Sequence, residues 1–347
     1  MRNRDEAGAS RTSVDCGLAS AATSNGPPAA ENPFVFIVGC SRSGTTLLRR
    51  ILDAHPHVAI APEQHWVPEL FEERIGVTPE GFVRPELVSR VLQEPNFLKL
   101  EIGEAQLRSL IRDQEPLDYS RFVAGVFDLY GELRGKPLVG EKTPGYVRKI
   151  PTLHALWPAV RFVHVIRDGR DVCLSANNWT RHLPVLQRRF PTWTRDPVVT
   201  AALWWKWHVR LGRQVREVLG PQRYHELSYE SLIVSPEAEC SGLCAFLDLP
   251  YDDAMLRFHE GRTRTKPGLS AKKAWLPVTP GLMDWRSQMP GADVERFEAA
   301  AGDALVELGY APAFPRQSAV VMEHVAEIRE LFTADLRARK QPLPEGW

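Results

Sequence analysis

A glycine-containing turn near residue 40 has the composition of an anion-binding loop. The apolar run Phe34-Val-Phe-Ile-Val38 leads into Gly39-Cys-Ser-Arg-Ser-Gly44, and a helical pattern begins at about Thr45. A strand that turns into a helix in this way directs backbone N–H groups and the positive end of the helix dipole toward one point. The predicted ligands of a phosphate or sulfate group are therefore Arg42, Ser43, Gly44, Thr45 and Thr46.

The turn differs from the P-loop of kinases and nucleotide triphosphatases at one important position. Its spacing of G-x4-G followed by two threonines matches, but Thr45 stands where those proteins carry a lysine. They also hold Mg²⁺ with the help of a carboxylate at the end of a strand, whereas Arg167 follows the strand-like run Arg161–Ile166 here. These differences favour a phosphosulfate over a metal-bound triphosphate, and no metal site is predicted.

Arg167 and Ser175 form a second candidate anion site. Arg167 stands at the end of a predicted strand, and Ser175 lies eight residues later on the helix that follows. A guanidinium and a hydroxyl placed in this way can converge on one phosphate, and ligands of parallel sheets lie at the carboxyl ends of the strands. The alternative role for Arg167 is an ion pair with Asp168 or Asp171.

The segments that must position these residues alternate between strand and helix. Besides the two runs already named, the sequence predicts strands at Lys136–Gly140 and Tyr224–Tyr229 and helices at Val198–Leu219 and Pro236–Leu247. The stretch from Trp66 to Gly135 shows no strand pattern, and we expect helices there that cover the active edge of the sheet. This alternation predicts the α/β class, as a P-loop NTPase-like three-layer fold with a central parallel sheet.

Length and composition indicate one globular domain. Hydrophobic residues make up 44% of the 347 residues and charged residues 25%, and 43 basic side chains balance 43 acidic ones. We therefore expect no nucleic-acid partner, no membrane span and, from five cysteines without paired spacing, a cytoplasmic location. The expected organisation is a disordered leader (1–31), the catalytic domain (32–315) and a C-terminal helical extension and tail (316–347). No oligomeric state is predicted.

Taken together, these motifs resemble the sulfotransferase family that uses 3′-phosphoadenosine-5′-phosphosulfate (PAPS). They are Arg42–Thr46, Leu52-Asp-Ala-His-Pro56 and Val165-Ile-Arg-Asp-Gly-Arg-Asp171 with Ser175. The nearest branch includes bacterial sulfotransferases and tyrosylprotein sulfotransferases, and the likeness runs from about residue 33 to 310. It implies that Arg42–Thr46 hold the 5′-phosphosulfate and that Arg167 and Ser175 hold the 3′-phosphate. Tyr229, in the matching stretch 229–236, joins them as a donor-binding residue.

Transfer to a hydroxyl requires a proton acceptor beside the nucleophile. In the tyrosylprotein branch a catalytic glutamate follows the His-Pro pair, and counting from His55 places Glu63 at that position. The neighbouring residues depart from that branch, so His65 is an alternative base. Lys142, in a turn resembling the family's lysine-containing turn, is expected with Arg42 to stabilise the charge on the leaving oxygen. Its alternative is an exposed lysine paired with Glu141.

Tryptophans and a late basic segment complete the predicted site. Trp66 and Trp179 are candidates for the acceptor pocket, whereas Trp204-Trp-Lys-Trp207, on a predicted helix, is assigned to the core. In the family a late loop covers the nucleotide, and the corresponding region here is 266–286. The basic residues of that region are Lys272, Lys273 and Arg286.

The predicted reaction is metal-free transfer of a sulfuryl group from PAPS to a hydroxyl, with release of PAP. The expected acceptor is a small molecule, a sugar or other glycan, or a natural product. Two other functions are consistent with the loop: a P-loop kinase-like phosphotransferase that uses ATP and Mg²⁺, and a non-catalytic protein that binds PAP or a sulfated ligand.

Overall fold

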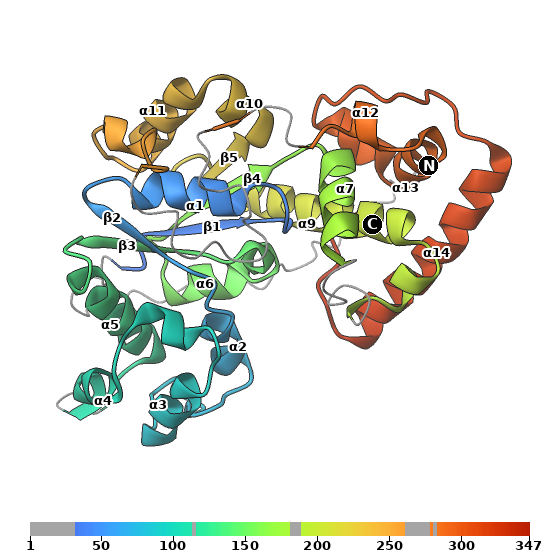
Figure 1. The fold of residues 1–347 in the computed structure, drawn as a ribbon. Helices are drawn as coiled ribbons and strands as arrows, with labels where there is room; N and C mark the ends of the chain where they lie inside the picture. Colours follow the sequence, from blue (N-terminus) through green and yellow to red (C-terminus); the bar gives the residue numbers. More distant parts are fainter. Residues whose placement is uncertain (1–31, 113–115, 181–188, 261–277, 280–282) are drawn as a thin grey trace, which may run out of the picture.

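A five-stranded parallel sheet forms the centre of the molecule (Figure 1). The computed structural model describes residues 32–112, 116–180, 189–260, 278–279 and 283–347. The strands are β1 (Val35–Gly39), β2 (Val58–Ala61), β3 (Leu138–Lys142), β4 (Arg161–Ile166) and β5 (Tyr224–Ser228). Their order is β2-β3-β1-β4-β5, and all four neighbouring pairs are parallel. This confirms the predicted α/β class with its central parallel sheet.

Side chains of the buried strands alternate between two helical layers. On β1, Phe36 and Val38 join one hydrophobic cluster, while Val35 and Ile37 join another on the opposite face. The first face carries α2 (Trp66–Glu72), α3 (Pro85–Leu92), α4 (Glu104–Arg112), α5 (Tyr119–Glu132) and α6 (Ile150–Leu156). The second carries α1 (Thr45–Asp53), α10 (Tyr229–Val234) and α11 (Pro236–Phe246). Figure 1 shows the resulting three layers.

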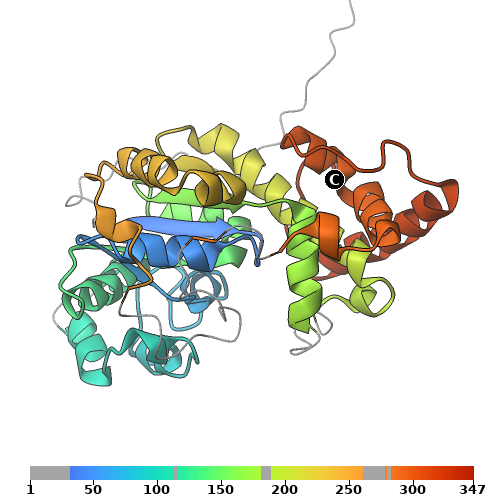
Figure 2. The same cartoon turned by 45° about the horizontal axis from the view of Figure 1, so that its top comes forward.

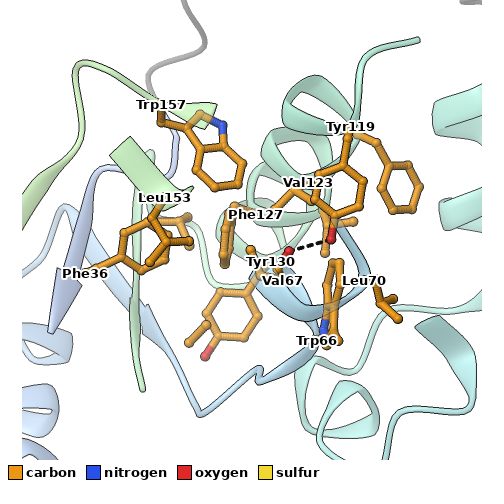
Figure 3. Close-up of a cluster of buried hydrophobic side chains, with 14 of the residues drawn as sticks. Phe36, Trp66, Val67, Leu70, Tyr119, Val123, Phe127, Tyr130, Leu153 and Trp157 are labelled. Atoms are coloured by element: carbon orange, nitrogen blue, oxygen red, sulfur yellow. Dashed lines mark hydrogen bonds between the residues drawn. The ribbon is translucent and has the colours of Figure 1, made fainter. Parts of the chain in front are cut away.

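Aromatic side chains fill the layer between the sheet and α2–α6. Figure 3 shows Phe36 of β1 beside Leu153 and Trp157, with Trp66 and Tyr119 on the helical side. The Tyr119 hydroxyl donates to the Val67 carbonyl at 2.6 Å, which satisfies the one polar atom of this buried ring. The predicted helices of the stretch 66–135 are thus present, and they rest on the face of the sheet.

A second group of helices lies beyond the carboxyl end of β4 (Figures 1 and 2). It consists of α7 (Gly169–Thr180), α9 (Pro197–Leu219), α13 (Gly291–Glu307) and α14 (Ala319–Ala338). Trp204, Trp205 and Trp207 are 3%, 0% and 1% exposed within its core, so their predicted packing role is confirmed. Phe332 of α14 is buried in the same cluster.

Short helical segments connect these elements. They are the 3₁₀ turns Phe97–Leu100 (η1), Pro144–Arg148 (η2), Pro191–Thr194 (η3) and Asp253–Met255 (η4), and the helix α12 (Trp285–Gln288). No helix within the described ranges is both long and apolar enough to cross a membrane.

The predicted bounds of β1 and β5 differ from the structure by one residue, and two larger differences concern β3 and β2. β3 begins and ends two residues later than the predicted strand at 136–140, and its pairing with β2 begins at Leu138 opposite Val58. β2 was not predicted. It has only four residues, and its pairing with β3 in parallel register, Ala61 opposite Glu141, is what places it in the sheet.

Candidate active site

Two glycines allow the turn after β1 to pass through a crowded space. Gly39 has φ of 145°, and a Cβ there would lie 2.6 Å from the Val165 carbonyl oxygen of β4. Gly44, at the N-cap of α1, has φ of 97°, and a Cβ there would lie 2.3 Å from the ring of Tyr229. Only glycine avoids both the collision and the positive φ, so the turn closes tightly onto the start of the helix.

The polar groups of this turn are open toward an anion. No side chain caps the N-terminus of α1, so the first N–H groups of the helix have no side-chain partner from the cap. Ser43 is 1% exposed, and its Oγ has no hydrogen-bond partner in the described structure. A buried hydroxyl without a partner is costly, and a phosphate or sulfate oxygen would satisfy it.

Arg42 connects the two predicted anion sites. It adopts a left-handed backbone conformation with φ of 79°, and its Nε donates to Ser175 Oγ on α7 at 3.0 Å. Burial lowers the pKa of Arg42, the positive charge of Arg167 lowers it further, and the carboxylate of Glu63 acts in the opposite direction. The two arginines, the serine and the carboxylate thus belong to one electrostatic site.

Arg167 occupies the end of β4, as predicted. Its guanidinium lies over the Tyr229 ring, 4.2 Å from the ring centre, and donates to Asp171 Oδ2 at 3.3 Å. The ion pair with Asp171 considered from sequence is therefore present, but it does not use the whole guanidinium. Arg167 is 6% exposed, and its Nε is buried without a partner among the described residues. This leaves donor capacity for an anionic ligand.

The loop after β4 is held by residues that the sequence analysis did not single out. The Trp285 backbone N–H donates to Asp171 at 2.8 Å, and its indole donates to Asp168 at 3.1 Å. Asp168 N–H in turn donates to Glu230 at 2.9 Å. Of the predicted basic residues nearby, Lys272 and Lys273 lie outside the described residues, and Arg286 lies over the Trp285 ring at 4.7 Å.

Glu63, His65 and Lys142 come together at the ends of β2 and β3. The Lys142 ammonium pairs with Glu63 Oε1, and His65 Nε2 lies 3.5 Å from Glu63 Oε2. Lys142 is only 5% exposed, so the alternative of an exposed lysine paired with Glu141 is wrong. Successive residues of a strand point to opposite faces, and Glu141 is therefore directed away from its neighbour.

Electrostatics distinguish the two candidate bases. Burial acts to raise the pKa of Glu63, but the hydrogen bond with His65 and the charge of Lys142 outweigh it and lower the pKa to about 2. The hydrogen bond to Glu63 raises the pKa of His65, while burial lowers the pKa of Lys142. Glu63 is thus ionised at neutral pH and His65 is biased toward its protonated form, which favours Glu63 as the proton acceptor.

Trp66, one of the two tryptophans predicted for the acceptor pocket, lies in the hydrophobic core instead. It is 2% exposed and lies among the buried side chains of Figure 3. Its indole donates to Gln64 Oε1 at 2.9 Å, and its ring packs against Phe97. Trp66 is therefore a core residue, and that prediction is wrong. The side chain of Trp179 lies outside the described part of the chain. In the described ranges, no group of three or more His, Cys, Asp or Glu side chains is arranged to hold a metal.

Comparisons with known proteins agree with this geometry. Residues 33–253 match the sulfotransferase family model. The protein-tyrosine sulfotransferase of Drosophila melanogaster is 28% identical over 292 residues, which are 81% of this chain and 52% of that protein. The chain thus spans about half the length of that relative. Protein-tyrosine sulfotransferase 1 of Danio rerio is 26% identical over 288 residues, covering 81% of this chain and 73% of that protein.

A solved structure supports the fold assignment independently. The sulfotransferase domain of the Synechococcus PCC 7002 olefin synthase superposes with a TM-score of 0.54 at 21% identity, covering 86% of this chain and 94% of that one. At this identity the likeness concerns the fold, and the family model supplies the assignment. The chain belongs to the sulfotransferase family, whose enzymes are PAPS-dependent.

Proposed function

We propose that this chain transfers a sulfuryl group from PAPS to the hydroxyl of an acceptor and releases PAP. The observation that carries the proposal is the meeting of two different sets of side chains at the carboxyl edge of the sheet. Arg42 and the open N-terminus of α1 suit an anion, and the Glu63 carboxylate, which pairs with Lys142, lies within electrostatic reach of Arg42. When bound, PAPS supplies an electrophilic sulfur with a phosphate as its leaving group.

Each group of residues has a distinct role in this scheme. The turn 42–46 would bind the 5′ end of the donor, and Arg167, Ser175 and Tyr229 would bind its 3′-phosphate. Glu63 would accept the proton of the acceptor hydroxyl. Lys142 and Arg42 would supply positive charge where bond breaking leaves negative charge on oxygen.

The pairing of Glu63 with Lys142 has a consequence for basicity. A carboxylate whose pKa is lowered to about 2 is a weak proton acceptor. Any weakening of its pairing with Lys142 raises the pKa of Glu63 and improves it as a base. Partner exchange by Lys142 is therefore part of the proposal: the lysine neutralises Glu63 at rest and stabilises the leaving oxygen during transfer.

Thermal unfolding in the presence of nucleotides tests the donor. PAP with EDTA should raise the melting temperature, because a ligand at a hundredfold excess over its Kd stabilises the folded state by about 2.7 kcal/mol. ATP with Mg²⁺ should raise it much less. A large shift with ATP that requires Mg²⁺, without a shift with PAP, would identify a kinase-like protein instead.

Turnover distinguishes an enzyme from a binding protein. We expect radiolabelled sulfate to pass from PAPS to at least one member of a panel of hydroxyl acceptors. The panel should contain simple alcohols, phenols, sugars and other glycans, natural products and, in view of the relatives' names, tyrosine-containing peptides. Tight PAP binding without any labelled product from such a panel would favour a non-catalytic binding protein.

A further inference from the structure

Glu141 is a fully buried carboxyl that the proposed reaction does not use. It is 0% exposed near the end of β3, opposite Phe36 of β1 and Ala61 of β2. Its side chain points into the face of the sheet that is covered by α2–α6, where Tyr119 and Tyr146 lie within electrostatic range. Burial of a carboxyl group in such an apolar layer costs free energy unless specific hydrogen-bond partners compensate for it.

The partners of Glu141 lie on the turn that carries the candidate bases. Its Oε1 accepts a hydrogen bond from the Gln64 backbone N–H at 2.9 Å and another from the Thr143 hydroxyl. The same Gln64 N–H is 3.2 Å from Thr143 Oγ1, so carboxylate and hydroxyl share it. Glu141 Oε2 is buried and has no partner among the described residues.

Gln64 is held from several other directions. The Tyr146 hydroxyl donates to its carbonyl at 2.6 Å, and the Trp66 indole donates to its Oε1 at 2.9 Å. Its own Nε2 donates to the Asn96 carbonyl at 3.0 Å. The carbonyl and side chain of Gln64 are thus bound by the helical layer, whereas its N–H is bound by the end of β3.

The Gln64 N–H belongs to the peptide unit that it shares with Glu63. Holding this N–H therefore fixes the backbone from which the Glu63 side chain extends. The last two residues of β3 consequently bind two successive residues of the neighbouring turn. Lys142 pairs with the Glu63 carboxylate, and Glu141 accepts a hydrogen bond from the Gln64 N–H. Because they point to opposite faces, the two contacts restrain the turn from both sides.

We propose that Glu141 is a positioning residue, which fixes the turn of Glu63 to β3 and thereby sets the distance between the base and Lys142. This inference rests on the proposed function, in which Glu63 and Lys142 act together. Glu141 does not touch the donor or the acceptor in this scheme. Its contribution is the pre-organisation of a pair whose misplacement by about 1 Å can cost about 10²-fold in rate.

Two substitutions at residue 141 separate positioning from general damage. Glu141→Ala removes the acceptor of the Gln64 N–H, and we expect kcat to fall by about 10²-fold while the Kd for PAP changes by less than about twofold. Glu141→Gln keeps an acceptor oxygen and should restore kcat to within about tenfold of wild type. A folded Glu141→Ala with wild-type kcat, or an equal loss of PAP affinity and kcat in that variant, would overturn the proposal.

Two further measurements apply if the alanine variant does not fold or if turnover cannot be followed. Thr143→Val removes the hydroxyl that shares the Gln64 N–H, and it should lower kcat less than Glu141→Ala, again with unchanged PAP affinity. Amide hydrogen exchange at Gln64 should be slow in wild type and Glu141→Gln and faster in Thr143→Val. That exchange pattern without sulfuryl transfer by any variant would sustain the positioning role and reject the proposed function, whereas fast exchange at Gln64 in wild type would reject the positioning role.

Discussion

The two sides of the candidate site differ in how their polar groups are satisfied. On the donor side, Ser43 Oγ and Arg167 Nε are buried without partners in the described structure. On the base side, Glu63 is paired with Lys142 and His65. The donor side thus has unused capacity to bind an anion, whereas the base side is neutralised internally. Affinity for the donor and reactivity toward the acceptor should therefore be separable by mutation.

The largest expected effect lies on the base side. Glu63→Gln keeps the size of the side chain but removes the charge that accepts a proton. General-base catalysis contributes about 10² to 10⁴ in rate, so kcat should fall by that factor, equivalent to about 2.7–5.5 kcal/mol. The Kd for PAP should change little. Steady-state kinetics together with calorimetric titration of PAP would measure both quantities.

His65→Gln is the matched control for that substitution. Because the hydrogen bond to Glu63 raises the pKa of His65, the imidazole is a poorer proton acceptor, and its loss should lower kcat less. An essential His65 beside a dispensable Glu63 would reverse the assignment. Wild-type turnover in both variants would mean that this turn does not supply the base.

The next largest effect is expected on the donor side. Arg167→Ala removes a guanidinium from the proposed 3′-phosphate site, and the loss of a charge-assisted contact costs about 1.5–3 kcal/mol. The Kd for PAP should therefore rise by about 10- to 150-fold. Calorimetry provides this number, and a melting curve of the unliganded variant checks its fold. An unchanged Kd in a folded variant would remove Arg167 from the donor site.

The same division separates what the sequence could and could not predict. The donor turn is local: a buried strand, two glycines and a helix start follow one another within residues 35–45, and each part leaves its own pattern. Arg167 likewise follows directly from the end of β4. The parallel sheet and the central helix α9 were predictable for the same reason, since long apolar or amphipathic runs determine them.

The base side depends on contacts between distant segments. Glu63 could be placed by counting from His55, but the strand before it, β2, has four residues and is recognised only by its pairing with β3. The predicted strand at 136–140 stopped before Glu141, so the opposite orientations of Glu141 and Lys142 were not apparent. Trp285 contacts Asp168 and Asp171, which are more than 100 residues away in the sequence. A local sequence pattern cannot predict such a contact.

Titration offers a third way to distinguish the two sides. Burial raises the pKa of Glu141 to about 7. The hydrogen bonds from Thr143 and Gln64 and the charge of His65 act to lower this pKa, and the charge of Glu63 acts to raise it. In the unfolded chain the pKa of a glutamate is about 4.3. The folded protein therefore binds more protons between these values, and its stability should decrease as pH rises from about 4.3 to about 7.

Comparison with Glu141→Gln isolates this contribution, because glutamine does not titrate. The free energy of unfolding of wild type, relative to the variant, should fall by at most about 1.4 kcal/mol per pH unit across that interval. Urea unfolding at several pH values measures the difference. Parallel pH profiles for the two proteins would show that folding does not change the pKa of Glu141.

The smallest effect is expected at the point where the donor site joins α7. Ser175 Oγ accepts the hydrogen bond from Arg42 Nε, so Ser175→Ala removes an orienting contact as well as a proposed phosphate ligand. A single hydrogen bond contributes about 1 kcal/mol, which corresponds to a rise of about fivefold in the Kd for PAP. Ser175→Thr, which keeps the hydroxyl, is the control. Arg42 is also proposed to stabilise the leaving oxygen, so kcat should fall modestly in Ser175→Ala. In Arg167→Ala, by contrast, the Kd for PAP should rise and kcat should change little. A drop in kcat as large as that of Glu63→Gln would contradict the separation of the two sides and would place Ser175 at the reacting centre.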